Sequence, residues 1–406
     1  MDVPGTLSSR RLSPEFRLAI ATTVWPQSHD HAQRIEVAMA SPIDWELFVR
    51  VVRRHRIDGL AFQALIAANT PLPATTRAAL EAAAARQANK SLVYAAETVR
   101  ICRLLQDAGI AVASLKGASL SMLAFGNLGL RHCRDIDLLI SPDDVLHAHE
   151  VLTAATYELE MPIGPHSLNQ KKHWITHHKH FEYKSGKGIP LELHWRLFDN
   201  PYLLATRVEP ASWIEVPIFG NGVVRTLSAP GLLLYLCVHG ANHMWSRLKW
   251  LADVQALLRR AETGVLERLQ SDAQAEHCGR AVAQTLALTQ LLYGFPSSEP
   301  VTTKNDATRA LVRNAIVAMT SGDAALELEA IPFATSRVAV ARYWLKPEWK
   351  FWLRETNSML SDEHDRKSAH LPHSMRFVLP FLRLPLWLGR RIRGRGNSHR
   401  GTMGAD

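Results

Sequence analysis

The chain has 406 residues, of which 47% are hydrophobic and 21% charged, and its formal net charge is +9. This composition is ordinary for a folded protein and excludes wholesale disorder. No stretch reaches the ~18 uninterrupted apolar residues of a membrane-spanning helix. Residues 1–11 have no long apolar run behind them, so no secretory signal is predicted. Four cysteines without a CxxC pair argue against a zinc knuckle or a disulfide framework and predict a reducing, cytoplasmic location.

The positive charge is concentrated near the end of the chain. Residues 366–400 contain nine Lys or Arg and no acidic residue, which leaves residues 1–365 with a net charge of +1. We therefore expect residues 361–406 to form a basic, partly disordered tail. The apolar segment 377–388 lies within this tail, which predicts a peripheral contact with the inner membrane or another polyanion. A merely solubilising tail is the alternative.

The first part of the chain, residues 1–109, is predicted to be helical. Phe48, Val51 and Val52 recur at helical spacing, and residues 73–108 are rich in good helix formers up to Gly109. Residues 110–115 then form a short apolar run that fits a buried strand. The strand ends at Lys116-Gly117, and residues 118–125 return to helix.

Residues 135–140 are the next predicted strand, and a helix follows with Ser141 at its cap and Pro142 at its first position. Residues 177–184 and 189–195 flank a glycine-containing turn and predict a β-hairpin. A second hairpin is expected around the turn Gly220-Asn-Gly222. Helical patterns resume from Ser228.

These patterns predict an α+β protein with a small mixed-sheet core between helical regions. The core is expected at residues 110–227, after the N-terminal helical region at 1–109 and before a helical domain at 228–360. The basic tail at 361–406 completes the predicted organisation. No internal repeat is visible.

Carboxylates on two of the predicted strands are the strongest chemical signal. Asp135 and Asp137 project from one strand face because residues two apart point the same way, and Glu192 and His194 share a face on a later strand. Neighbouring carboxylates repel each other unless a cation lies between them, and a hard divalent ion is the usual one. Neutralising either Asp is therefore expected to leave stability unchanged or to raise it. Three carboxylates around Mg²⁺ (or Mn²⁺) suit in-line attack on a nucleoside triphosphate.

Donors for a triphosphate precede the carboxylates in the chain. Lys116 and Gly117 lie where a strand turns into a helix, so backbone N–H groups there point toward a bound anion. Ser119 adds a hydroxyl, and Arg131 and Arg134 come just before the carboxylate strand. These five residues are the predicted nucleotide ligands. For Lys116, an ion pair at a helix end is the alternative.

Three segments in this order resemble the uncharacterised bacterial nucleotidyltransferases of the polymerase-β-like superfamily. They are Leu115-Lys-Gly-Ala118, Arg134-Asp-Ile-Asp-Leu-Leu-Ile140 and Leu191-Glu-Leu-His-Trp195. Residues 236–253 are similar to the helical part of that group, and the resemblance spans roughly residues 40–300. It implies that Asp135 and Asp137 are the metal pair, Glu192 the third carboxylate and Gly117 the phosphate-turn glycine. Ala118 departs from the Gly or Ser usual at its position, and the connection at 119–134 is longer than usual.

Further polar residues are possible cleft residues: His194, His239, His243, Lys249 and Asp253. The two histidines have zinc-compatible spacing, although hydrogen bonding in the cleft wall is the simpler interpretation. Lys249 and Asp253 could instead pair on a helix surface.

Two groups of aromatic side chains also have alternative expected locations. The histidines at 173, 177, 178 and 180 are expected to be split between strand faces, at a cleft rim or on the surface. The tryptophans at 174, 195, 245 and 250 are expected in the core, and one of them could instead stack on a base.

The predicted function is metal-dependent transfer of a nucleoside monophosphate from ATP or another NTP to a hydroxyl or phosphate. The acceptor would be a small molecule, a glycan or a peptide, and neither it nor the oligomeric state can be identified from the residues. A degenerate nucleotide- or partner-binding protein of the same fold is one alternative, because Ala118 departs from the family pattern. An RNA-modifying nucleotidyltransferase is another, although the nearly neutral body lacks the basic surface that RNA binding favours.

Overall fold

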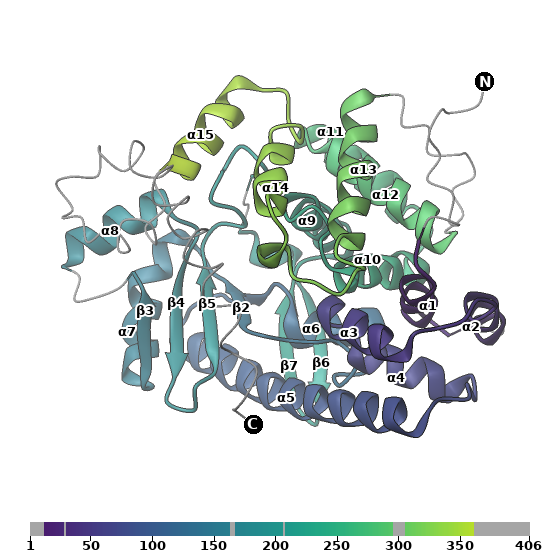
Figure 1. Ribbon diagram of the computed structural model, residues 1–406. Coiled ribbons are helices and arrows are strands. Elements are labelled where there is room, and N and C mark those ends of the chain that lie inside the picture. The colour runs from purple at the N-terminus through teal and green to yellow at the C-terminus, as the bar shows by residue number, and fades with distance from the viewer. Residues whose placement is uncertain (1–11, 28–29, 163–166, 206–207, 295–304, 361–406) are drawn as a thin grey trace, which may run out of the picture. The chain divides into compact units, whose positions relative to one another are not determined.

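A computed structural model describes residues 12–27, 30–162, 167–205, 208–294 and 305–360 (Figure 1). The chain divides into two compact units, residues 1–346 and 347–406, and the second contains helix α15 (Trp349–Leu360). The basic tail predicted at 361–406 lies outside the described residues, so its structure and membrane contact stay predictions, as do the finer domain boundaries. Within the described ranges, no helix is long and apolar enough to cross a membrane.

The first part of unit 1 is helical, as the sequence predicts. Its helices are α1 (Pro14–Thr22), α2 (His31–Ala38), α3 (Trp45–His55), α4 (Asp58–Ala67) and α5 (Ala74–Asp107). The Asp44 side chain caps α3 by accepting a hydrogen bond from the Leu47 amide at 3.0 Å. Helix α3 ends because Arg56 adopts a left-handed conformation with φ of 57°. Arg56, at this end of α3, lines a cavity beside strand residues Asp137 and Glu192.

A five-stranded mixed sheet forms the centre of the α+β fold, which confirms the predicted fold class. Its strands are β1 (Ala113–Ser114), β2 (Ile136–Leu139), β3 (Tyr157–Met161), β4 (His180–Ser185) and β5 (Pro190–His194). Their order is β1-β2-β5-β4-β3, and Figure 1 labels the last four of these strands side by side. Strands β2 and β5 are parallel, and the other neighbouring pairs are antiparallel.

Three details of the sheet differ from the predictions. Strand β1 has only two residues, although the run at 110–115 is buried at Ile110, Val112 and Leu115. Strand β3, at the edge of the sheet, was not predicted, although its apolar residues Tyr157, Leu159 and Met161 alternate with two glutamates. Helix α8 (Leu168–His177) extends to the predicted start of β4. It begins at a capping box in which Ser167 and Gln170 bond reciprocally, a sequence signal that was overlooked.

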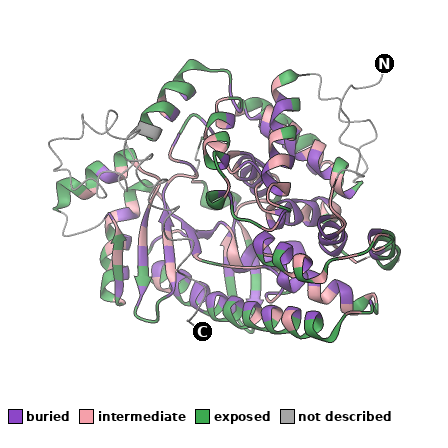
Figure 2. Ribbon diagram, in the orientation of Figure 1, coloured by how far each residue is buried: buried purple, intermediate pink, exposed green. Residues whose placement is uncertain are grey.

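The two faces of the sheet have different roles. Apolar side chains such as Ile136, Leu138 and Leu193 point to one face and pack against residues of α5 and of α7 (Val145–Ala154). Full burial of each such side chain stabilises the fold by about 1.5–3 kcal/mol. Figure 2 shows α5 buried along one side and exposed along the other. The polar residues of β2 and β5 alternate with these apolar ones and therefore point to the opposite face.

The rest of unit 1 consists of a helix after β1, a two-stranded hairpin and a series of helices that follow the hairpin. Helix α6 (Gly117–Phe125) follows β1, and a hairpin of β6 (Ile214–Phe219) and β7 (Gly222–Thr226) forms a separate sheet, as predicted. The helices that follow, which confirm the predicted helical region, are α9 (Ala229–Asn242), α10 (Leu248–Arg260), α11 (Val265–Ala275), α12 (Gly279–Tyr293), α13 (Asp306–Thr320) and α14 (Ala334–Arg342).

The junction between α9 and α10 depends on one close contact. Helix α9 stops at Asn242, and Met244 and Trp245 have φ of 52° and 49°. The chain folds back so far that a Cβ atom on Gly240 would lie 2.4 Å from the Trp245 ring. Glycine is therefore required at this position.

Candidate active site

The three predicted carboxylates meet at one cavity of about 270 Å³. Asp135 precedes β2, Asp137 lies in β2, and Glu192 in β5 is its register partner across the parallel pair. The shared wall follows from the register, because partners on neighbouring strands point to the same face. The volume is close to the lower end of small-molecule sites, at roughly 300–1,000 Å³. The cavity can therefore enclose the charged end of a ligand.

Asp137 is the most strongly compensated of the three carboxylates. Its Oδ1 atom lies 3.0 Å from Lys116 Nζ and 3.5 Å from His194 Nε2. Burial alone would raise the pKa of Asp137, but Lys116 and His194 together hold it well below its usual range. The pKa of Lys116 is raised against its burial by Asp137. The ammonium of Lys116 thus stands where a cation would neutralise this carboxylate.

Asp135 and Glu192 differ from Asp137 and from each other. Burial and the neighbouring charge of Asp137 raise the pKa of Asp135. Burial opposes the ionisation of Glu192, yet its close contact with His194, at 3.0 Å from Nε2 to Oε2, lowers the pKa to about 2. Asp135 is therefore the carboxylate whose negative charge is least balanced by the protein.

The turn before α6 has the predicted glycine but not the predicted hydroxyl contact. Gly117 lines the cavity with φ of 64°, and an added Cβ would meet only Cys133 Sγ at 3.7 Å. Backbone conformation rather than space therefore favours glycine there. The Ser119 hydroxyl is fully buried and lies 3.0 Å from the carbonyl oxygen of Lys116 and 3.3 Å from that of Ser114, either of which can accept its proton. Ser119 stabilises the turn and does not line the cavity.

Basic side chains dominate the rest of the lining. Arg131 and Arg134 reach the cavity as predicted, and Arg131 Nε also lies 2.9 Å from Asp253 Oδ1 in a buried ion pair. Lys249 Nζ donates to the His132 carbonyl oxygen at 3.3 Å. Lys249 and Asp253 are both buried, so the alternative of a pair on a helix surface is wrong. Burial, and then Arg131, lower the pKa of Lys249 to about 7.

An aromatic wall lies opposite these charges. His239 and His243 line the cavity with Trp250, and the Trp250 ring centroid lies 5.6 Å and 5.3 Å from the two imidazoles. Burial is the main cause of the low pKa of both histidines. It lowers the pKa of His239 well below its usual value and the pKa of His243 to about 3. Both rings are therefore neutral at pH 7. In the described ranges neither belongs to a group of three metal-ligating side chains, so the zinc alternative is not supported.

The other aromatic predictions have mixed outcomes. Trp174, Trp195 and Trp245 are buried, as expected of core residues, whereas Trp250 is half-buried in the cavity wall. The histidines at 173 and 177 are not split by strand alternation, because both lie on α8, where their rings are 4.2 Å apart. They are exposed, and only the histidine at 180 lies in β4.

Several lining residues were missed by the sequence analysis. Arg56, Cys133, His132 and Lys179 all line the cavity. Arg56 comes from the end of α3, far from the carboxylates in sequence, and Lys179 stands just before β4. Only the position of His132 and Cys133 between Arg131 and Arg134 could have indicated them. No local sequence pattern indicates Arg56. Its position at the C-cap of α3 reaches the cavity only because of the way that helix packs.

A mixed sheet with carboxylates on neighbouring strands, facing a helix N-terminus and a basic cavity, defines the architecture of a nucleotidyltransferase core. A protein-family model described as "Uncharacterised nucleotidyltransferase" matches residues 41–294. The match covers the whole sheet and helices α9 and α10. The chain therefore belongs to this nucleotidyltransferase family, as the resemblance implied. No curated protein is a significant match to the sequence.

Proposed function

We propose that the protein transfers a nucleoside monophosphate from an NTP to a hydroxyl or phosphate of an acceptor, and that the reaction depends on Mg²⁺ or Mn²⁺. The observation that carries this proposal is the cavity itself. Its lining combines three carboxylates, Asp135, Asp137 and Glu192, with six lysines and arginines. Carboxylates alone would repel a triphosphate, and basic residues alone would not bind a divalent cation.

The carboxylates fit a hard divalent ion. All three offer oxygen atoms, which Mg²⁺ prefers, and burial together with the neighbouring charge of Asp137 raises the pKa of Asp135. A bound ion would neutralise charge on the reacting phosphate and acidify the acceptor hydroxyl. Asp135, Asp137 and Glu192 would hold it.

The chain's own residues would position the nucleotide. Arg56, Arg134 and Lys249 line the cavity and supply positive charge for the β- and γ-phosphates. The N-terminus of α6 at Gly117 adds backbone N–H donors. In the reaction, an acceptor hydroxyl would lose its proton to water, its oxygen would bond to the α-phosphorus, and the bond from that phosphorus to the bridging oxygen of the departing pyrophosphate would break. These donors then balance the charge of the departing pyrophosphate.

Nucleotide binding without turnover is a second candidate, favoured by the ion pair between Lys116 and Asp137. An ammonium that permanently occupies Asp137 would hinder cation binding. The test is incubation with each NTP and Mg²⁺ or Mn²⁺, together with small-molecule and macromolecular fractions of a cell extract. Metal-dependent pyrophosphate release that needs an extract fraction supports the transferase. Saturable NTP binding without any pyrophosphate release supports the second candidate, and absence of NTP binding contradicts both.

The low pKa of Lys249 predicts a pH dependence of nucleotide binding. Its ammonium is charged below pH 7 and mostly neutral above it, so bound phosphate loses a positive partner as the pH rises through about 7. Above that value NTP binding must be accompanied by proton uptake, which weakens it by up to about tenfold per pH unit. Lys249→Arg keeps the charge and should flatten this dependence. Titrations of both proteins with a non-hydrolysable NTP between pH 6 and 8.5 compare the slopes, and equal slopes would contradict the prediction.

A further inference from the structure

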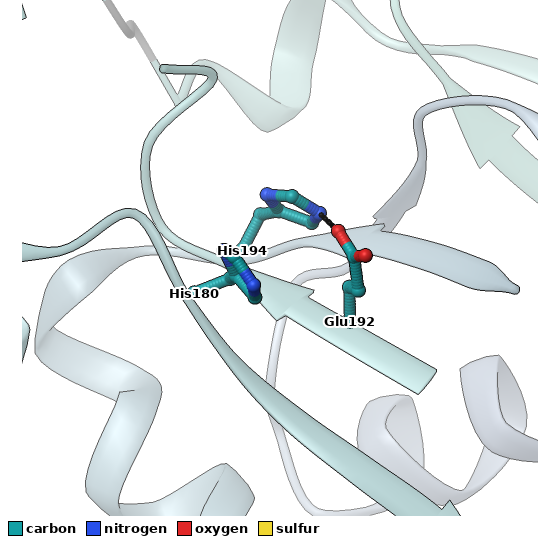
Figure 3. Close-up of side chains that lie close together, drawn as sticks. All are labelled: His180, Glu192 and His194. Carbon is teal, nitrogen blue, oxygen red and sulfur yellow. Dashed lines mark ion pairs between the residues drawn. The ribbon is translucent and has the colours of Figure 1, made fainter. Parts of the chain in front are cut away.

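A second group of possible ligands lies beside the carboxylates, on strands β4 and β5. His180, Glu192 and His194 each offer one ligand atom, and these atoms all lie within 4.8 Å of one another (Figure 3). The sheet register produces the group, because His180 and His194 are partners across the antiparallel pair. Glu192 precedes His194 by two residues and so shares its face. This grouping was not predicted from the sequence.

Both histidines have a buried ring nitrogen that the protein leaves unsatisfied. Across the residues that the structure describes, Nδ1 of His180 and both ring nitrogens of His194 are buried without a hydrogen-bond partner, and Nε2 of His194 lies 3.0 Å from Glu192 Oε2. The His194 side chain is 3% exposed. Leaving a buried polar atom unpaired costs about 1–3 kcal/mol, so such atoms call for a bound ion or water.

The contact with Glu182 prepares His180 to act as a ligand. His180 Nε2 lies 3.0 Å from Glu182 Oε1, and an N–H donated there leaves the lone pair on Nδ1. Histidines that bind metals commonly donate their other ring N–H to a carboxylate in this way, which fixes the tautomer. Glu192 also lines the neighbouring cavity, so an ion can reach the group from there.

We propose that His180, Glu192 and His194 bind a first-row transition-metal ion next to Asp135 and Asp137. Two imidazoles and one carboxylate are the ligands of Zn²⁺, Co²⁺ or Fe²⁺ sites with open positions, whereas Mg²⁺ takes oxygen ligands. Metal binding at this site is inferred from these three residues alone, and only a role of the ion in catalysis rests on the proposed function. The cavity would then hold two kinds of ion, with Glu192 between them.

Co²⁺ is a suitable probe because its visible ligand-field bands shift and become more intense when imidazole ligands in a site of low coordination number replace water. Full-length, tag-free protein is treated with a chelator and titrated with Co²⁺ in the absence of nucleotide. One Co²⁺ per chain with such a spectrum is expected. Glu182→Gln should weaken binding by about 10–100-fold through His180. Because Glu182 is 43% exposed, this variant keeps the fold. His180→Gln should weaken binding at least as much.

Two further variants separate this site from its neighbours. His147→Gln changes an exposed histidine of α7 and should leave Co²⁺ affinity unchanged. Asp135→Asn should also keep the spectrum, since Asp135 belongs to the oxygen-ligand group. Wild-type affinity in both His180→Gln and Glu182→Gln, or loss of Co²⁺ in Asp135→Asn, would overturn the proposal. Because no NTP is present, none of these results depends on whether the protein transfers nucleotides.

Discussion

Asp135→Asn is expected to abolish nucleotidyl transfer while leaving the unfolding temperature unchanged or raised. The side chain contributes charge to the proposed ion site, and its removal should lower kcat by at least about 10²–10³-fold, by analogy with other lost transition-state contacts. Stability should not suffer, because the pKa of Asp135 is raised above 3.8. For a carboxyl whose pKa is higher in the folded state, the contribution to the free energy of unfolding is present below pH 3.8 and is lost as the pH rises through the folded-state pKa. The uncharged amide of the Asn side chain does not ionise and so avoids that loss.

The measurements are pyrophosphate release and thermal unfolding on the same preparations. Asp143→Asn is the matched control, since it removes an exposed Asp from the turn that follows β2. The control should keep normal turnover. If Asp135→Asn instead melts earlier and loses turnover only in proportion to its unfolded fraction, Asp135 is a structural residue.

Asp137→Asn is expected to behave differently, because it should destabilise the fold by about 3–5 kcal/mol. The substitution leaves the buried ammonium of Lys116 without the carboxylate that lies 3.0 Å away. This corrects the expectation from sequence that both Asp residues respond alike. The pKa of Asp137 is lowered, so its contribution to stability is present above pH 3.8 and lost as the pH falls through the folded-state value.

A double variant isolates the ion pair. Lys116→Met combined with Asp137→Asn removes both charges, and most of the lost stability should return, because a buried pair replaced by uncharged groups is often neutral. The four proteins form a double-mutant cycle in denaturant unfolding. Additive effects of the two single substitutions would show that Lys116 and Asp137 do not interact.

The residues of the site were predictable from sequence because local periodicity places them. Asp135 and Asp137 share a face through the two-residue repeat of a strand, and Glu192 follows the same rule on β5. Their meeting depends on the parallel pairing of β2 with β5, which was not predicted, because strand pairing is not visible in a local pattern.

The partners of these residues were not predictable, because they come from distant parts of the chain. Lys116 was expected at phosphate, yet the short β1 brings it to Asp137. The Ser119 hydroxyl bonds to the backbone at the start of its own helix, and Arg56 lines the cavity because of the way α3 packs. The His180 group depends on the antiparallel register of β4 with β5, which a hairpin pattern predicts only to within a few residues.

The most direct test of the proposed function follows the phosphates of the NTP. Wild-type protein and Asp135→Asn are incubated with Mg²⁺, the active extract fraction and NTP labelled at either the α- or the γ-phosphate. We predict that α-label appears in the acceptor, that γ-label appears in pyrophosphate, and that Asp135→Asn gives neither. Transfer of γ-label to the acceptor, or equal α-label transfer by well-folded Asp135→Asn, would contradict nucleotidyl transfer by this group of carboxylates.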